Sequence, residues 1–202
     1  MQDQLTYDRL LLLRLIKSYY RMQRERICFD QNDKSYERNN IKLLEEDSTI
    51  FSNIGESFET VEGAIEKQIK KYLKKFDIFT GFLKEVTGIG PLMAGILISK
   101  FNPLDDVAPE SYGIEHEGAY AKDGKIYRMR TVSQFWKYAG LHAMKIVGKD
   151  GIEKFIGARR VEGQKADHDV WLKSKMIGVL GPSFIKSRSP YTEFYYARKK
   201  FK

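Results

Sequence analysis

The chain has 202 residues, of which 42% are apolar and 31% are charged, so it can form a folded core and is unlike a disordered segment. Its single cysteine, Cys28, excludes a disulfide framework and a cysteine-based zinc cluster. The apolar run LLLLRLI near the start is too short to span a bilayer, and Asp3 and Asp8 precede it where a signal peptide has positive charge. We therefore expect no membrane association and a location inside the cell, in the cytoplasm with the nucleoid.

The net charge of +8 is unevenly distributed along the chain. Residues 1–80 hold 14 Lys+Arg and 14 Asp+Glu, residues 81–121 hold 2 and 6 (net −4), and residues 122–202 hold 19 and 7 (net +12). A segregated cationic segment is typical of a surface that binds polyanions, with an affinity that falls as salt rises. The alternative is a solvated basic face without a partner.

The first eighty residues have the periodicity of long helices. Apolar residues recur every three or four positions from Tyr7 to about Ile27, and again from Glu59 to Glu85. Polar residues between them predict a loop and then a short helix around Ile41–Glu46; these are Asn32, Asp33, Asn39 and Asn40. We expect residues 1–80 to be a helical connector, either an antiparallel pair or a homodimerisation element.

The stretch LKEVTGIGPLMAGILISKF, residues 83–101, predicts two short helices joined by a tight bend. Gly88 can take the positive φ that ends the first helix, and Gly90 allows a second change of direction. Pro91 suits the first turn of the next helix, where its missing N–H has no cost.

Such a bend leaves backbone N–H groups without intrahelical partners beside the positive end of a helix dipole. Glycines keep that surface open to a phosphate group. The pattern of Gly88, Ile89, Gly90 and Ala94 resembles the helix-hairpin-helix, a module that grips nucleic-acid backbones without reading sequence. The residues that we expect to contact nucleic acid here are Lys84, Thr87, Gly88, Ile89 and Gly90. The alternative is a glycine turn that only packs two helices.

Residues 102–128 form a turn-rich insert, in which Lys122–Lys125 is a candidate tight turn between short extended pieces. The following SQFWKYAGL predicts a helix that is capped by Ser133 and closed at Gly140. Trp136 and Tyr138 can stack on bases, but packing in the core is the favoured interpretation.

The cationic segment supplies five further candidate contacts to nucleic acid: Arg159, Arg160, Lys165, Lys173 and Lys175. The first three belong to a short run that can follow phosphates. The two lysines are expected on the outer face of a helix that ends at Gly181–Pro182.

The sequence SPYTEFYYARKKFK predicts a last helix, with Ser189 as its cap and Pro190 in its first turn. Tyr191, Phe194 and Tyr195 are expected to pack inward.

The order of a G-I-G-P-L-M-A hairpin, a turn-rich insert, the FWKYAGL helix and a basic segment resembles the C-terminal domain of IS110/IS116/IS902-family transposases. The resemblance covers roughly Phe82 to the C-terminus, and the helix before it resembles the connector of that family. It implies a protein of a mobile genetic element that takes part in DNA recombination.

Two departures argue against catalysis by the family's route. The chain opens with the helical connector and has no room for a RuvC-like nuclease domain. The run from Gly140 to Asp169 lacks the serine that the family carries after its Gly-Leu. A metal site from Asp105, Asp106, His116, His168 and Asp169 is only a weak alternative, so we predict no catalytic residue, no metal and no cofactor.

The sequence thus predicts a mainly α protein, with a helical connector over residues 1–80 and a helix-hairpin-helix domain over residues 81–202. We expect it to bind duplex, branched or structured nucleic acid, either DNA or RNA, through phosphates and without catalysis. The alternatives are an active transposase, recombinase or metal-dependent nuclease, and a structural or protein-interaction module.

Overall fold

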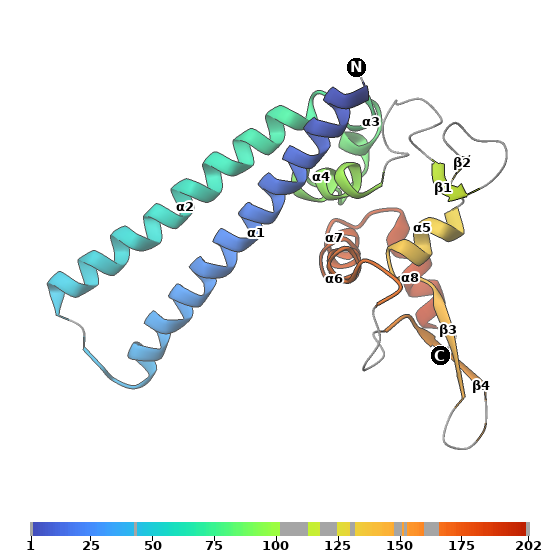
Figure 1. The fold of residues 1–202 in the computed structure, drawn as a ribbon. Coiled ribbons are helices and arrows are strands. Elements are labelled where there is room, and N and C mark those ends of the chain that lie inside the picture. The colour runs from blue at the N-terminus through green and yellow to red at the C-terminus, as the bar shows by residue number, and fades with distance from the viewer. Residues whose placement is uncertain are drawn as a thin grey trace. The chain divides into compact units, whose positions relative to one another are not determined.

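A computed structural model describes residues 2–42, 44–101, 113–117, 125–129, 132–147, 151, 153–159 and 166–200. The chain divides into two compact units, residues 1–76 and 77–202, whereas the sequence placed the boundary after residue 80. The protein is mainly helical, as predicted, and strands in the described residues form only two antiparallel pairs (Figure 1).

The first unit is a hairpin of two long helices, α1 (Gln2–Arg38) and α2 (Glu45–Leu73) (Figure 1). They are antiparallel, because residues near the start of α1 pair with residues near the end of α2. Lys75 Nζ donates to Asp8 at 2.9 Å, and Arg26 Nε donates to Glu62 Oε1 at 2.8 Å. Leu12, Ile16, Ile69 and Leu73 are fully buried.

Helix α1 continues eleven residues beyond the end expected at Ile27, so the predicted break at Asn32 and Asp33 is wrong. The ring of Phe29 lies 5.7 Å from that of Phe51 and 6.0 Å from that of Phe58, both on α2. This packing outweighs the weak helix propensity of Asn and Asp. The helix ends at Arg38, after which Asn40 takes a left-handed conformation (φ 55°).

Helix α2 begins at Glu45, so the short helix expected near Ile41–Glu46 and the later one form a single element. It also stops at Leu73 instead of reaching Glu85. The Phe76 N–H donates to the Leu73 carbonyl at 3.1 Å, and the Phe76 side chain is buried. The chain therefore turns where a large apolar side chain enters the core.

The second unit opens with α3 (Asp77–Gly81), the 3₁₀ turn η1 (Leu83–Glu85) and α4 (Pro91–Lys100). Helix α4 is buried from Met93 to Ile98. Ala94 is completely buried, in line with the small residue that the hairpin pattern demands.

Two strand pairs follow, and helix α5 (Val132–Tyr138) lies between them in the chain. Strands β1 (Gly113–Glu117) and β2 (Lys125–Met129) confirm the extended pieces expected in the insert. Strands β3 (Ala143–Val147) and β4 (Glu153–Gly157) were not predicted, and they pair antiparallel.

The helix expected to end at Gly181–Pro182 instead runs through them, as α6 (Val170–Lys175), the π-helical turn η5 (Met176–Leu180) and α7 (Gly181–Lys186). In η5 the Gly181 N–H bonds five residues back, to the Met176 carbonyl. This wider turn restarts the hydrogen-bond register, and Pro182 falls in the first turn of α7, where no N–H is needed.

The last helix, α8 (Tyr191–Lys199), starts one residue later than predicted, with Pro190 as its N-cap, and its aromatic residues are not buried. The side chains of Tyr191, Phe194 and Tyr195 are all exposed. Ser189 is buried, and its hydroxyl has no hydrogen-bond partner among the described residues, so it does not cap the helix.

Among the residues that the structure describes, no helix combines the length and the apolar character needed to cross a membrane.

Candidate nucleic-acid interface

The bend between η1 and α4 has the backbone that the glycines predict. Gly88 has φ +97°, Gly90 is the residue before the first turn of α4, and Pro91 lies in that turn. The Ile89 N–H donates to the Val86 carbonyl at 3.0 Å and closes the turn. Ile89 therefore gives shape to the bend, and its amide is not available to a ligand.

Gly88 does not leave a bare surface, which corrects the sequence-based expectation. A Cβ atom at residue 88 would lie 2.6 Å from Phe184 Cδ1 and 2.9 Å from Ser187 Oγ. The hydroxyl of Ser183 also donates to the Gly88 carbonyl at 2.7 Å. One side of the bend is thus covered by α7, and Gly88 is glycine because of its φ and this close approach.

The other side of the bend is open. Thr87 and Gly90 are exposed, and no atom of the described residues lies within 4 Å of the position that a Cβ of Gly90 would occupy. Within the described part of the chain, the N–H groups of Thr87, Gly88 and Gly90 have no hydrogen-bond partner. Gly90 is the N-cap of a ten-residue helix, whose dipole favours an anion there, and Thr87 and Gly88 shortly precede it.

The predicted basic contacts have different environments. Lys84 and Arg159 are exposed, as a phosphate contact requires. Lys173 is half-buried and donates to the Ala158 carbonyl, so it fixes the segment that precedes Arg159. Of the remaining candidates, Arg160 and Lys165 lie outside the described residues.

Lys175 is also held inside the fold. Its Nζ lies 5.9 Å from the centre of the Trp171 ring, and Lys100 Nζ lies 5.7 Å from the same ring. Burial lowers the pKa of Lys175 because it disfavours the charged ammonium. Lys84 and Arg159 are accordingly better phosphate ligands than Lys173 and Lys175.

Two histidines share one carboxylate, an arrangement that sequence separation concealed. His168 Nδ1 lies 2.8 Å from Asp167 Oδ1, and His142 Nε2 lies 3.2 Å from Asp167 Oδ2. The hydrogen bond with His168 is the main reason that the pKa of Asp167 is lowered, and His142 adds to it. Gly140 (φ +67°) lies against the His168 ring, since a Cβ there would be 2.5 Å from His168 Cδ2.

Asp169, which the sequence offered as a metal ligand, has a structural role. It accepts hydrogen bonds from Lys100 Nζ at 2.6 Å and from the Leu172 N–H at 2.9 Å, and it caps α6. Burial raises its pKa, but the bonds from Lys100 and Leu172 outweigh burial and the net pKa is lowered. Asp105 and Asp106 lie outside the described residues, and the described residues contain no group of three potential ligands suited to a metal ion.

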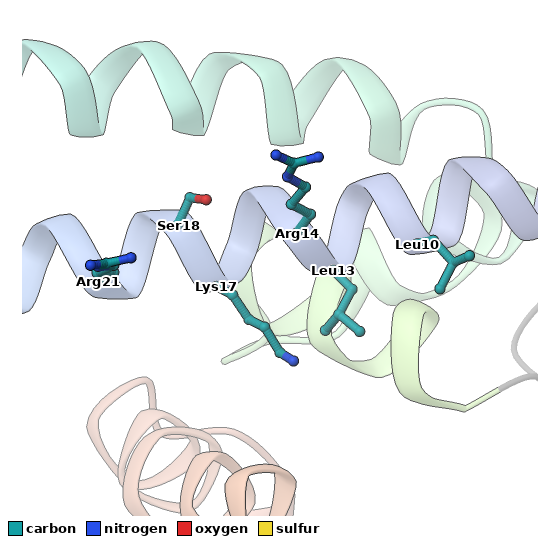
Figure 2. Close-up of a pocket in the computed structure, with 6 residues that line it drawn as sticks. All are labelled: Leu10, Leu13, Arg14, Lys17, Ser18 and Arg21. Carbon is teal, nitrogen blue, oxygen red and sulfur yellow. The ribbon is translucent and has the colours of Figure 1, made fainter.

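A second cationic surface lies on α1, where the sequence showed only a balanced charge over residues 1–80. Residues 9–24 contain no Asp or Glu, and four of their five Lys and Arg residues are exposed, since only Arg9 is buried. Six of the α1 side chains line a hollow of about 400 Å³; they are Leu10, Leu13, Arg14, Lys17, Ser18 and Arg21 (Figure 2). Arg14 extends toward α2 and Lys17 extends away from it (Figure 2).

The chain matches no protein-family model, no curated protein and no solved structure with which it was compared.

Proposed function

We propose that the chain binds nucleic acid through its backbone phosphates. These phosphates bind at the open side of the bend at Thr87–Gly90. The observation that carries this proposal is the combination of three amides without partners and free space around Gly90 at the start of α4. A phosphate oxygen there accepts from backbone N–H groups and lies at the positive end of the helix dipole.

The charge of the second unit supports an anionic partner. Residues 77–202 hold 21 Lys+Arg and 14 Asp+Glu, a net charge of +7 out of the total of +8. Lys84 lies three residues before Thr87 and is exposed, so it can neutralise a neighbouring phosphate. Backbone contacts of this kind position the ligand and do not read its sequence.

The test compares two replacements of Gly90. They should have the same effect on folding stability and different effects on phosphate binding. Gly90 has φ −82° and ψ 171°, and Asp and Asn both adopt this conformation and both cap helices well. Gly90→Asp places a carboxylate over the amides and repels phosphate, whereas Gly90→Asn caps the helix without charge.

Affinity is measured by fluorescence anisotropy with duplex DNA, junction DNA and structured RNA at two salt concentrations. We expect salt-sensitive binding by the natural chain, a loss of roughly tenfold or more in Gly90→Asp, and a smaller loss in Gly90→Asn. If all three proteins bind equally, or none binds, the bend is a packing turn and the protein-interaction alternative takes its place.

We also propose descent from the IS110/IS116/IS902 transposases, on the hairpin and FWKYAGL motifs, with binding as the retained property. The competing candidate is an active recombinase or nuclease. Magnesium-dependent nicking of duplex or junction DNA that a chelator abolishes would establish that candidate and refute binding without catalysis. A homodimer through α1 and α2 stays a prediction, for which light scattering is the measurement.

A further inference from the structure

An apolar pocket of about 330 Å³ lies in the second unit, close in sequence to the bend. Its walls come from η1, α4, α5 and the π-helical turn, through Leu83, Leu97, Phe101, Phe135, Trp136 and Met176. None of the described residues that line it is charged. Trp136, which the sequence placed in the core, is 55% exposed at this pocket, so a large aromatic surface faces water here.

The pocket has the character of a site for a flat ring. Phe101 meets Phe135 edge to face, with ring centres 5.5 Å apart, which keeps these two rings in fixed orientations. The indole of Trp136 is free to stack because more than half of it is exposed. Stacking on an aromatic side chain accepts any base, since every base has a π-face.

Two lysines that adjoin wall residues in the sequence favour a ligand that is both planar and anionic. Lys84 follows Leu83 and Lys137 follows Trp136 in the chain, and both lysines are exposed. Glu85 lies 4.0 Å from Lys84 and offsets part of this charge, but the unit as a whole carries +7. The charges of these lysines would not strengthen the binding of an apolar peptide. A nucleotide can use both the pocket and these charges, because its base is apolar on its faces and its phosphate is anionic.

We propose that this pocket holds one unpaired base of a nucleic acid whose backbone is bound at the bend, which rests on the function proposed above. Leu83 lies in the pocket wall, and η1 leads from it directly into Thr87–Gly90. Helix α4 contributes Leu97 to the same wall and presents its first turn to the phosphate. The protein then prefers single-stranded, bulged or branched sites to a continuous duplex.

The experiment uses the full chain with Trp171→Phe, so that Trp136 is the only fluorescent tryptophan. Three DNA probes of equal length are compared: a paired duplex, a duplex with a one-base bulge, and the same bulge with an abasic residue. We expect the bulged base to quench Trp136 emission and to bind about 5- to 150-fold more tightly than its abasic counterpart, as base stacking on an aromatic side chain provides.

Trp136→Leu in the natural chain should abolish the preference for the bulge, and Trp136→Phe should restore part of it. Because Trp136 is mostly exposed, neither change removes core packing. Salt-sensitive binding of all three probes with equal affinity would overturn the base pocket and leave the proposed function intact. If none of the three probes binds, both the base pocket and the proposed function are overturned. A Trp136→Leu protein with unchanged DNA binding and altered self-association would assign the pocket to protein docking and also overturn the proposal.

Discussion

The hydroxyl of Ser183 donates a 2.7 Å hydrogen bond to the carbonyl oxygen of Gly88, across 95 residues of sequence. This bond joins α7 to the bend between η1 and α4. Gly90 lies outside this contact, since no described atom is within 4 Å of the position that its Cβ would occupy. Helix α7 covers the bend at Gly88. It therefore also holds in place the uncovered side of the bend, which we propose to bind phosphate.

The two glycines of the bend should respond differently to alanine. Gly88→Ala forces a left-handed backbone on a side chain, which costs about 1–2 kcal/mol, and places a methyl group against Phe184 and Ser187 at a further cost of about 1–3 kcal/mol. Gly90→Ala adds its methyl group to empty space, so only the loss of a glycine cap, a few tenths to about 1 kcal/mol, is expected. Urea unfolding measures both. Equal effects of the two changes would contradict the close approach of α7 to Gly88.

Gly140 and Gly151 form a second matched pair, with φ values of +67° and +71°. Alanine at either position carries the same backbone penalty of about 1–2 kcal/mol. At Gly140 the new methyl group would meet the His168 ring, at 2.5 Å, whereas no atom of the described residues lies within 4 Å of it at Gly151. We expect Gly140→Ala to lower the free energy of unfolding by about 1–3 kcal/mol more than Gly151→Ala. A difference near zero in urea midpoints would show that the His168 ring can move aside without a loss of stability.

Asp167 should make stability depend on pH in the acid range. The folded state lowers its pKa below the ordinary value of about 3.9, so its contribution is complete above that value and is lost as the pH falls through the lower, folded pKa. Urea midpoints of the natural chain should therefore decrease below about pH 4. Asp167→Asn should be less stable at neutral pH and should show a weaker decrease below about pH 4, the remainder coming from Asp169. Identical acid profiles for the two proteins would refute the role of this carboxylate.

Lys84→Gln should change the salt dependence of DNA binding by a defined amount. If Lys84 neutralises one phosphate, the slope of log affinity against log salt concentration becomes less steep by about 0.9. Lys70→Gln is the control, because Lys70 Nζ already lies 2.6 Å from Glu66 within α2. Titrations at four salt concentrations measure the slopes. A slope for Lys84→Gln that matches the natural chain would exclude a phosphate contact by this lysine.

The signals that the sequence carried well were local. Gly88, Gly90 and Pro91 determine the bend through their own allowed backbone angles, and each has the predicted conformation or place. The start of α8 after Pro190 is local in the same sense. Such features depend on residues within one turn and not on the rest of the fold.

The features that sequence reasoning missed depend on tertiary partners. Asn32 and Asp33 stay helical because Phe29 packs on α2. Trp136 is exposed, in a helix that was predicted but that begins at Val132 and so includes Ser133, the expected cap. His142 is 25 residues from Asp167, and no local pattern indicates that they meet. The role of α7 in covering Gly88 was hidden for the same reason.

The π-helical turn at Met176–Leu180 sets the angular phase of α7. An α-helix advances by about 100° per residue, so a chain shortened by one residue at this turn would rotate α7 by that angle about its axis. Ser183 and Phe184 would then face away from Gly88, with which they now make a hydrogen bond and a close contact. The one extra residue in this π-helical turn thus determines which side of the bend at Thr87–Gly90 is shielded from water.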